Sequence, residues 1–340
     1  MRTSWVCLAM ALGFLLGFVG SVEAAVVSFG SGGNRFDMEF VTIRNPGNAN
    51  DSLPSNFKVG SVGYTFQMGK YEVSESMFTK YSAEFGSANN LPIGNFDSYG
   101  PNKPGKWVSW NNAARFVNWL NTSSGGFAAY KFTSSGVNDN IALWTPADTL
   151  DYDPNNLYRS KRAKYVLPTY NEWHKAAFYD PTKNGGAGGY WTYATGSDSA
   201  PASVAFGTDP YTSVYGRGFN NPPADINLAG GLSPYGVMGM NGNIMEWEES
   251  SFDLTNSDPT LPRAFRVGNW AEGGSLHKNQ SRGFYGPNQG GFLIGFRVAS
   301  LTSEGGGEVP EPSSMVIGAL LGLGGVLARK RSGSRTTRHD

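Results

Sequence analysis

Apolar and polar residues alternate in the first part of the chain, with a spacing of two residues. The alternation covers Phe36–Val41 and returns between Val59 and Met68, so both stretches are predicted to be β-strands. The segment between them, 45–56, is rich in Asn, Pro, Gly and Ser, which are typical turn residues. The chain is therefore predicted to begin with a small sheet.

Helices are predicted where the apolar spacing changes to three and four residues. Ser74 and Ser109 each stand just before such a stretch and are favoured N-terminal cap residues. A third helix is predicted after Thr169, because Thr169 and Glu172 have the spacing of a capping box. This pattern gives Glu172 a structural role, so we assign it no chemistry.

The stretch from Ser233 to Trp247 is the most informative segment of the chain. It contains a loop rich in Gly and Asn, followed by Glu246 between two large apolar residues. A tight loop with one fixed carboxylate suits calcium, which takes carbonyl and carboxylate oxygens as ligands. The alternative is a tight turn leading into a buried strand, with Glu246 satisfied by backbone N–H groups.

Composition narrows the class of protein. The 46 glycines and an aromatic content of 14% favour loops held by large rings over long helices. The sequence has 27 basic and 27 acidic residues, and outside its two ends the acidic residues are in excess. This balance argues against nucleic acid and anionic membrane surfaces as partners.

The N-terminus has the features of a secretory signal peptide. Arg2 precedes an apolar run from Trp5 to Val19, and small residues precede the predicted cleavage by signal peptidase after Ala24. The alternative, a membrane anchor, needs about 20 apolar residues. Because Cys7 is the only cysteine and lies in the signal 1–24, the exported protein is predicted to have neither a disulfide nor a thiolate.

Several motifs resemble the formylglycine-generating enzyme (sulfatase-modifying factor) family. They are G-x-N-G-N-x-x-E-W at 239–247, L-P-T-x-x-E-W at 167–173 and G-F-R-V-A at 295–299. The resemblance implies one domain over 25–303 with an irregular, C-type-lectin-like α+β fold, rich in Gly and Trp and poor in regular secondary structure. It also implies a structural calcium ion, held by the carbonyls of Asn241, Gly242 and Ile244 and the carboxylate of Glu246.

The same resemblance raises a question about catalysis. Catalytic members place two cysteines three and eight residues after the serine of a G-G-S motif, where this chain has Lys278 and Gly283. Those thiolates bind copper and activate oxygen to convert a substrate cysteine into formylglycine. Copper(I) prefers soft ligands, and His277 alone is a poor substitute. The sequence therefore argues against copper as a cofactor and against any catalytic residue here.

A polar groove is predicted in the segment that replaces the catalytic one. Its amides, guanidinium and aromatic faces suit a polyhydroxylated or sulfated ligand such as a polysaccharide. The alternative is that these are solvated loop residues. The groove residues are Trp270, Ser275, His277, Arg282 and Asn288.

The C-terminus resembles a PEP-CTERM sorting signal, which exosortases read. V-P-E-P-S at 309–313 precedes an apolar run at 315–328 and the basic cluster Arg329–Arg331. The run is short for a stable span, so we expect transient membrane anchoring and removal of 309–340 after the linker 304–308. The expected location is the cell surface or extracellular matrix of a Gram-negative-type bacterium that makes exopolysaccharide.

Two functions remain open at this point. The first is an exported, surface-sorted, non-catalytic binding or matrix protein linked to exopolysaccharide. The alternative is a formylglycine-generating-type oxidoreductase that acts on exported sulfatases or other proteins. The missing cysteines favour the first function, while the retained scaffold motifs are compatible with both.

Overall fold

The computed structural model describes residues 24–52, 58–86, 98–134, 136, 139–274 and 278–301, and all structural statements concern this part of the chain. A five-stranded antiparallel sheet joins the beginning of the domain to its end. Its strands, in spatial order, are β1 (Ala25–Phe29), β2 (Phe36–Ile43), β3 (Phe66–Gly69), β13 (Ala299–Leu301) and β4 (Tyr165–Val166).

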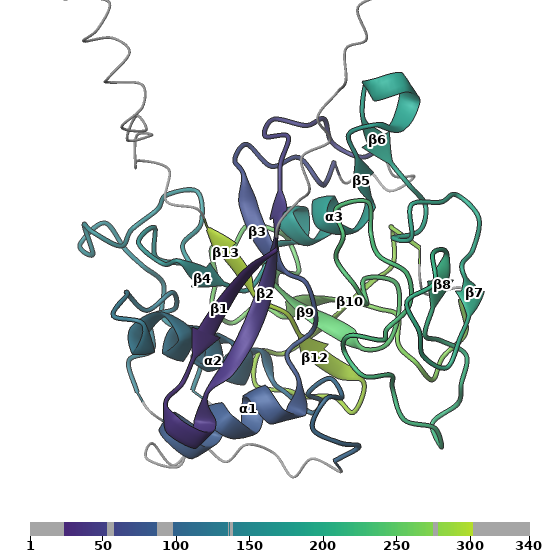
Figure 1. The fold of residues 1–340 in the computed structure, drawn as a ribbon. Coiled ribbons are helices and arrows are strands. Elements are labelled where there is room, and N and C mark those ends of the chain that lie inside the picture. Colours follow the sequence, from purple (N-terminus) through teal and green to yellow (C-terminus); the bar gives the residue numbers. More distant parts are fainter. Residues whose placement is uncertain are drawn as a thin grey trace, which may run out of the picture. The chain divides into compact units, whose positions relative to one another are not determined.

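A second sheet of four strands lies beside the first and carries the Gly/Asn loop (Figure 1). Its central strand, β9, is antiparallel to β10 and parallel to β12. In spatial order the strands are β11 (Arg282–Tyr285), β10 (Arg263–Arg266), β9 (Met245–Ser251) and β12 (Ile294–Phe296). Two short pairs complete the described strands: β5 (Tyr179–Asp180) with β6 (Gly189–Tyr190), and β7 (Ala202–Ser203) with β8 (Thr212–Ser213).

Three α-helices begin where their caps predict. In α1 (Glu75–Tyr81) and α2 (Trp110–Ser123), the hydroxyls of Ser74 and Ser109 accept hydrogen bonds from the backbone. In α3 (Tyr170–Phe178), Thr169 and Glu172 form the predicted capping box. Shorter turns occupy Gly32–Asn34 and Lys183–Gly186 (3₁₀) and Ser82–Gly86 (π).

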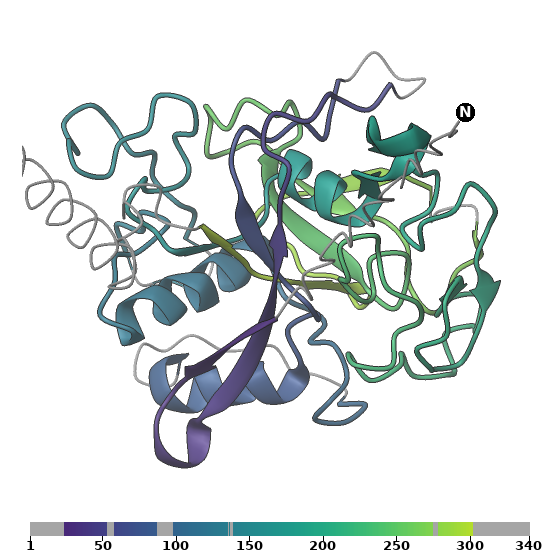
Figure 2. The same cartoon turned by 45° about the horizontal axis from the view of Figure 1, so that its top comes forward.

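The helices are divided between the two sides of the strands. Figures 1 and 2 show α1 and α2 together on one side and α3 on the other. An aromatic core fills the α1–α2 side, where the Phe116 ring lies 5.7 Å from Phe78 and 5.4 Å from Phe296. Within the described segments, no helix is both long enough and apolar enough to cross a membrane.

The predicted α+β class is confirmed, and one predicted strand is wrong in its extent. Residues 36–41 lie within β2, as predicted, but only the end of the stretch from 59 to 68 is a strand, beginning at Phe66. Val59 makes a single bridge to Asp51, and Gly60 has φ +91°, which interrupts an extended strand. Alternating polarity did not reveal this break.

Candidate functional site

Strand β9 carries three glutamates that are almost completely buried. A buried carboxylate is costly unless a counter-charge and hydrogen bonds compensate for the lost water. Each of the three side chains forms an ion pair with one arginine from another element of the fold. The pairs are Glu246–Arg297 (2.5 Å), Glu248–Arg266 (2.6 Å) and Glu249–Arg159 (2.7 Å).

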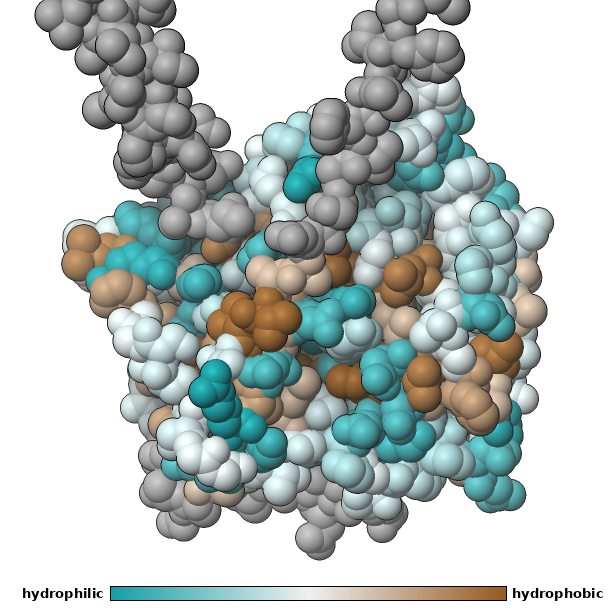
Figure 3. Space-filling view, in the orientation of Figure 1, coloured by the Kyte–Doolittle hydropathy of each residue, from teal (hydrophilic) through white to brown (hydrophobic). Residues whose placement is uncertain are grey.

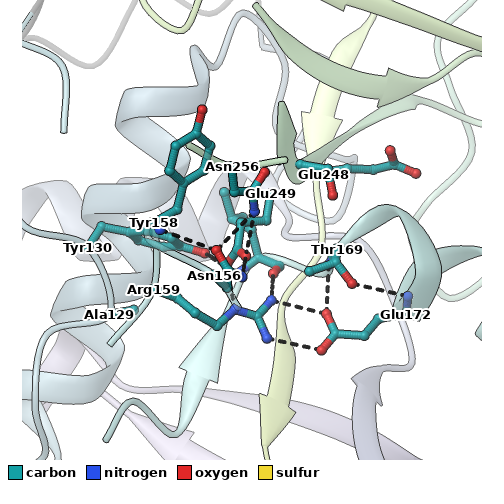
Figure 4. A network of polar contacts seen from close by, with 12 residues as sticks. Ala129, Tyr130, Asn156, Tyr158, Arg159, Thr169, Glu172, Glu248, Glu249 and Asn256 are labelled. Atoms are coloured by element: carbon teal, nitrogen blue, oxygen red, sulfur yellow. Dashed lines mark hydrogen bonds and ion pairs between the residues drawn. The ribbon is translucent and has the colours of Figure 1, made fainter. Parts of the chain in front are cut away.

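Arg159 connects β9 with the start of α3 (Figure 4). Its Nε donates to Glu249 at 2.7 Å, and its two terminal nitrogens donate to Glu172 at 3.0 and 3.1 Å. Glu249 also accepts from Tyr130 at 2.8 Å. Burial raises the pKa of Glu172, yet Arg159 and the hydrogen bonds from Tyr64 and Thr169 bring this pKa below its ordinary value. The cluster is a structural junction in which one guanidinium serves two carboxylates; burial, together with the charge of Glu172, raises the pKa of Glu249.

The residues predicted to hold calcium have other partners. Both carboxylate oxygens of Glu246 accept from Arg297 at 2.5 Å, and one also accepts from the Trp173 indole at 2.8 Å. The carbonyl oxygens of Asn241 and Gly242 each accept a hydrogen bond as well, from the Ser213 hydroxyl and the Ile244 amide respectively.

This arrangement does not fit a calcium ion at Glu246. The guanidinium of Arg297 already neutralises this carboxylate, and a second cation beside it would be repelled. In the described part of the chain, no group of three or more His, Cys, Asp or Glu side chains could hold a metal. Calcium binding by the protein therefore stays a prediction of the resemblance, and no chemistry is derived through it.

Glu72 is a fourth buried carboxylate beside the Gly/Asn loop, and it has no arginine of its own. One of its oxygens accepts from the Asn243 amide at 3.1 Å, while the other has no hydrogen-bond partner among the described residues. The loop approaches so closely that a Cβ at Gly239, where φ is +76°, would lie 2.5 Å from this carboxylate. Burial, assisted by the charge of Glu246 and opposed by Arg297, raises the pKa of Glu72 to about 8.

We expect Glu72 to make the protein less stable at alkaline pH. Folding raises the pKa of Glu72 from 4.5 to about 8, so the folded protein binds this proton more tightly than the unfolded chain does. The contribution of this proton to the free energy of unfolding is full below pH 4.5 and is lost as the pH rises through 8. Urea unfolding of wild type and Glu72→Gln between pH 5 and 9, in steps of about one unit, measures this. Stability should fall with pH in the wild type and much less in the variant. Equal pH dependence in both proteins would contradict the assignment.

His174 is buried on α3 between two charged residues. Its Nε2 lies 2.8 Å from the Asp51 carboxylate, and its Nδ1 lies 3.2 Å from an Arg266 nitrogen. Because Arg266 can only donate, Nδ1 must accept and Nε2–H donates to Asp51. Burial lowers the pKa of His174 to about 4, against the opposing effect of Asp51. The imidazole is a neutral link between the 51 loop and β10.

His174 should limit stability at acid pH. Because its pKa falls from 6.5 to about 4 on folding, the unfolded chain takes up a proton first, and stability decreases as the pH falls from 6.5 to 4. The full decrease is about 3 kcal/mol. Unfolding curves of wild type and His174→Gln across this pH range test the direction of the change. The variant should be less stable than the wild type at pH 7, but its stability should depend much less on pH. A slope retained by the variant would show that other groups cause it.

The two positions that hold cysteines in catalytic relatives have no metal-binding character here. Lys278 is exposed in the segment before β11. Gly283 lies in β11 against the Phe265 ring, and a Cβ added at Gly283 would lie 2.4 Å from a ring atom. A cysteine at 283 would therefore clash with Phe265 as it is placed, so the residues present do not fit copper.

The predicted groove residues have different surroundings. Trp270 is fully buried, with its indole donating to the Asn221 carbonyl, so its prediction as a groove residue is wrong. Arg282 lies over the rings of Tyr170 and Phe252, while Asn288 is exposed in the turn after β11. Ser275 and His277 lie outside the described residues. The position of Trp270 in a Gly-rich segment did not indicate whether its side chain is exposed.

Sequence patterns did not indicate Arg159 or Arg266 as partners of the β9 acids. Arg159 is 90 residues from Glu249, in a segment without a readable pattern, whereas Arg266 is 18 residues from Glu248, on the neighbouring strand β10. The available signal was the composition of β9, M-E-W-E-E-S-S, because a buried strand with three acids requires three cationic partners. Arg297 was visible in the G-F-R motif, but its partner was not assigned.

Comparisons with known proteins identify a domain family and solved structures of similar fold. Residues 45–301 match the sulfatase-modifying factor enzyme 1-like domain. Treponema denticola variable protein 1 has a similar fold, with a TM-score of 0.51 and 17% identity, covering 81% of this chain and 98% of that one. CarF (TM-score 0.48, 19% identity, 78% and 98% covered) and PvdO from Pseudomonas aeruginosa (0.48, 18%, 81% and 98%) are also similar.

Comparison with curated proteins gives no match. The domain match nevertheless spans most of the chain, from the loop after β2 to the end of β13, and includes the Gly/Asn loop and the paired glutamates of β9. The protein therefore belongs to the sulfatase-modifying factor enzyme 1-like domain family.

Proposed function

We propose that this protein is a non-catalytic binding or matrix domain on the sulfatase-modifying factor scaffold. The proposal is carried by the residues that this chain has at the two positions where catalytic family members have copper-binding cysteines. The chain has Lys278 and Gly283 there, and Phe265 fills the space beside position 283. A thiolate site needs two sulfur ligands at these places, and the only cysteine of the sequence is Cys7.

The buried polar groups also support a structural use of the scaffold. The acids of β9 are held by arginines, and His174 is held neutral between Asp51 and Arg266. A general acid or base needs access to a substrate proton, which these fully enclosed groups lack. Among the described residues, these buried groups thus hold elements of the scaffold together and offer no accessible proton donor or acceptor to a substrate.

An aldehyde assay tests the proposal. The purified protein is incubated with copper, reductant, oxygen and a cysteine peptide of the sulfatase type, and formylglycine is followed by mass spectrometry. We expect no conversion, while a cysteine-containing family member converts the peptide under the same conditions. Conversion by this protein would overturn the proposal and make His277 the first residue to replace.

The proposed location is the cell surface or extracellular matrix. The signal at 1–24 and the PEP-CTERM-like tail at 309–340 support export and exosortase processing, and both lie outside the described residues. Association with exopolysaccharide follows from that tail, with Arg282 and Asn288 as the described polar residues of the proposed binding segment. Mature protein from its host that retains 315–340 would contradict the sorting proposal.

A further inference from the structure

A cavity that is separate from the candidate site lies among the loops that follow β7 and β8, the two strands labelled at the right of Figure 1. Its volume is about 360 Å³, at the lower end of the range for small-molecule sites. Most of its walls are apolar and include Phe206, Pro222, Pro223 and Leu228. We propose that it binds a small carboxylate with a single aromatic or branched aliphatic body.

The backbone around the cavity is fixed by hydrogen bonds to the core of the domain. The amide of Ala224 donates to the Asn243 side chain at 2.8 Å, and the amide of Arg217 donates to the Trp270 carbonyl at 2.9 Å. The Leu228 carbonyl accepts from the amide of Gly207 at 2.8 Å. Because these hydrogen bonds hold the walls in place, binding has less of the backbone to order, which favours a real site over a transient gap.

The charges at the cavity favour an anion. Lys103 pairs with Asp225 at 2.8 Å, so these two residues compensate each other. Arg217 also lines the cavity, and no described residue makes a hydrogen bond or ion pair with its guanidinium. One positive charge is therefore left over. A guanidinium matches the geometry of a carboxylate and binds it through two parallel hydrogen bonds.

The apolar walls define the rest of the ligand. Phe206 is 68% exposed, so its ring offers a face on which a planar group can stack. A sugar would bring several hydroxyls into a cavity with few polar groups, and each unpaired hydroxyl costs free energy. The cavity therefore favours one ring or branched chain with one anionic head over a polysaccharide.

This inference does not rest on the proposed function. The cavity is lined by 103, 205–206, 217, 222–225 and 228, and none of these residues lies in the segment 278–288. The same chemistry occurs in two sources, a free aryl carboxylate and the C-terminal residue of a peptide. Both present a ring and a carboxylate, so the experiment must separate them.

Calorimetric titration of the full chain with 3-phenylpropionate and with N-acetyl-Gly-Phe tests the proposal, using the corresponding amides as uncharged controls. We expect saturable binding of at least one acid below about 1 mM, and binding about tenfold weaker for its amide. Tighter binding of the peptide acid would identify a chain terminus as the source. Equal or tighter binding of 3-phenylpropionate would identify the free acid.

Three variants make the test specific. Arg217→Met should weaken binding of the acid about tenfold, and Ala205→Trp should abolish it by filling the cavity. Arg44→Met removes an exposed arginine elsewhere and should leave binding unchanged. Failure of both acids to saturate by about 10 mM would overturn the proposal. So would unchanged binding in Arg217→Met or in Ala205→Trp, with melting temperatures confirming that each variant is folded.

Discussion

Replacement of Arg159 by methionine is expected to lower the free energy of unfolding by roughly 3–5 kcal/mol or more. The guanidinium bridges Glu172 and Glu249, whose side chains are both 0% exposed, so its loss leaves two carboxylates without their counter-charge. A domain is stable by only about 5–15 kcal/mol, so this loss is a large fraction of the total. Urea unfolding followed by tryptophan fluorescence measures the change.

The matched control is Arg162→Met, which removes a neighbouring arginine from a more exposed ion pair. Arg162 and Asp151 are 31% and 14% exposed, and the expected loss is about 1 kcal/mol or less. If Arg159→Met does not fold at all, Arg159→Lys provides an intermediate, because lysine retains the charge but cannot fork between two acids. A loss in Arg159→Met no greater than in the control would refute the central role of this junction.

Replacement of Arg297 by methionine is the second large effect that we expect, again roughly 3–5 kcal/mol. Arg297 donates to both oxygens of Glu246 and to the carbonyls of Gly69 and Met238, at 3.0 and 2.9 Å. These contacts join β9, the end of β3 and the Gly/Asn loop. Without them the acid and both carbonyls are buried without their strongest donor.

A double replacement separates the charge from the packing. Arg297→Met with Glu246→Leu should be more stable than Arg297→Met alone, because the second change removes the unpaired carboxylate. A double variant that loses the sum of the stability losses of the two single variants would contradict this account. Calcium gives an independent check on Glu246: a melting temperature that falls on addition of a chelator would support a calcium ligand at this residue instead.

Local signals in the sequence predicted the helix starts correctly, and the reason is physical. Ser74, Ser109 and the Thr169–Glu172 pair act on backbone groups two or three residues away, so their role depends little on the rest of the fold. The alternation of β2 was equally readable. The false strand start at Val59 arose because glycine geometry at 60 outweighed the polarity pattern.

The contacts that shape the candidate site, in contrast, join residues that are far apart in the sequence. Glu249 and Arg159 are separated by 90 residues, and Glu246 and Arg297 by 51, so no local pattern relates them. The same holds for the apolar cavity, whose walls come from four separate segments. The guanidinium of Arg217 has no hydrogen-bond or ion-pair partner among the described residues, and in the sequence this arginine was indistinguishable from any solvated one.

Apolar and polar residues are interspersed on the surface of the molecule that Figure 3 displays. Phe252 and Phe284, whose ring centroids are 4.5 Å apart, are among the exposed aromatic residues and are 43% and 48% exposed. They stand beside Arg282, so the segment that is catalytic elsewhere in the family is here an aromatic and cationic surface.

The most direct test of the central claim, a family scaffold without copper chemistry, is a copper(I) competition under anaerobic, reducing conditions. The protein is titrated into a coloured copper(I)–chelator complex, and loss of colour reports transfer of the metal. The account predicts that the chelator keeps the copper, because the chain offers no pair of soft ligands at 278 and 283. Transfer of one copper per chain to the protein would contradict it.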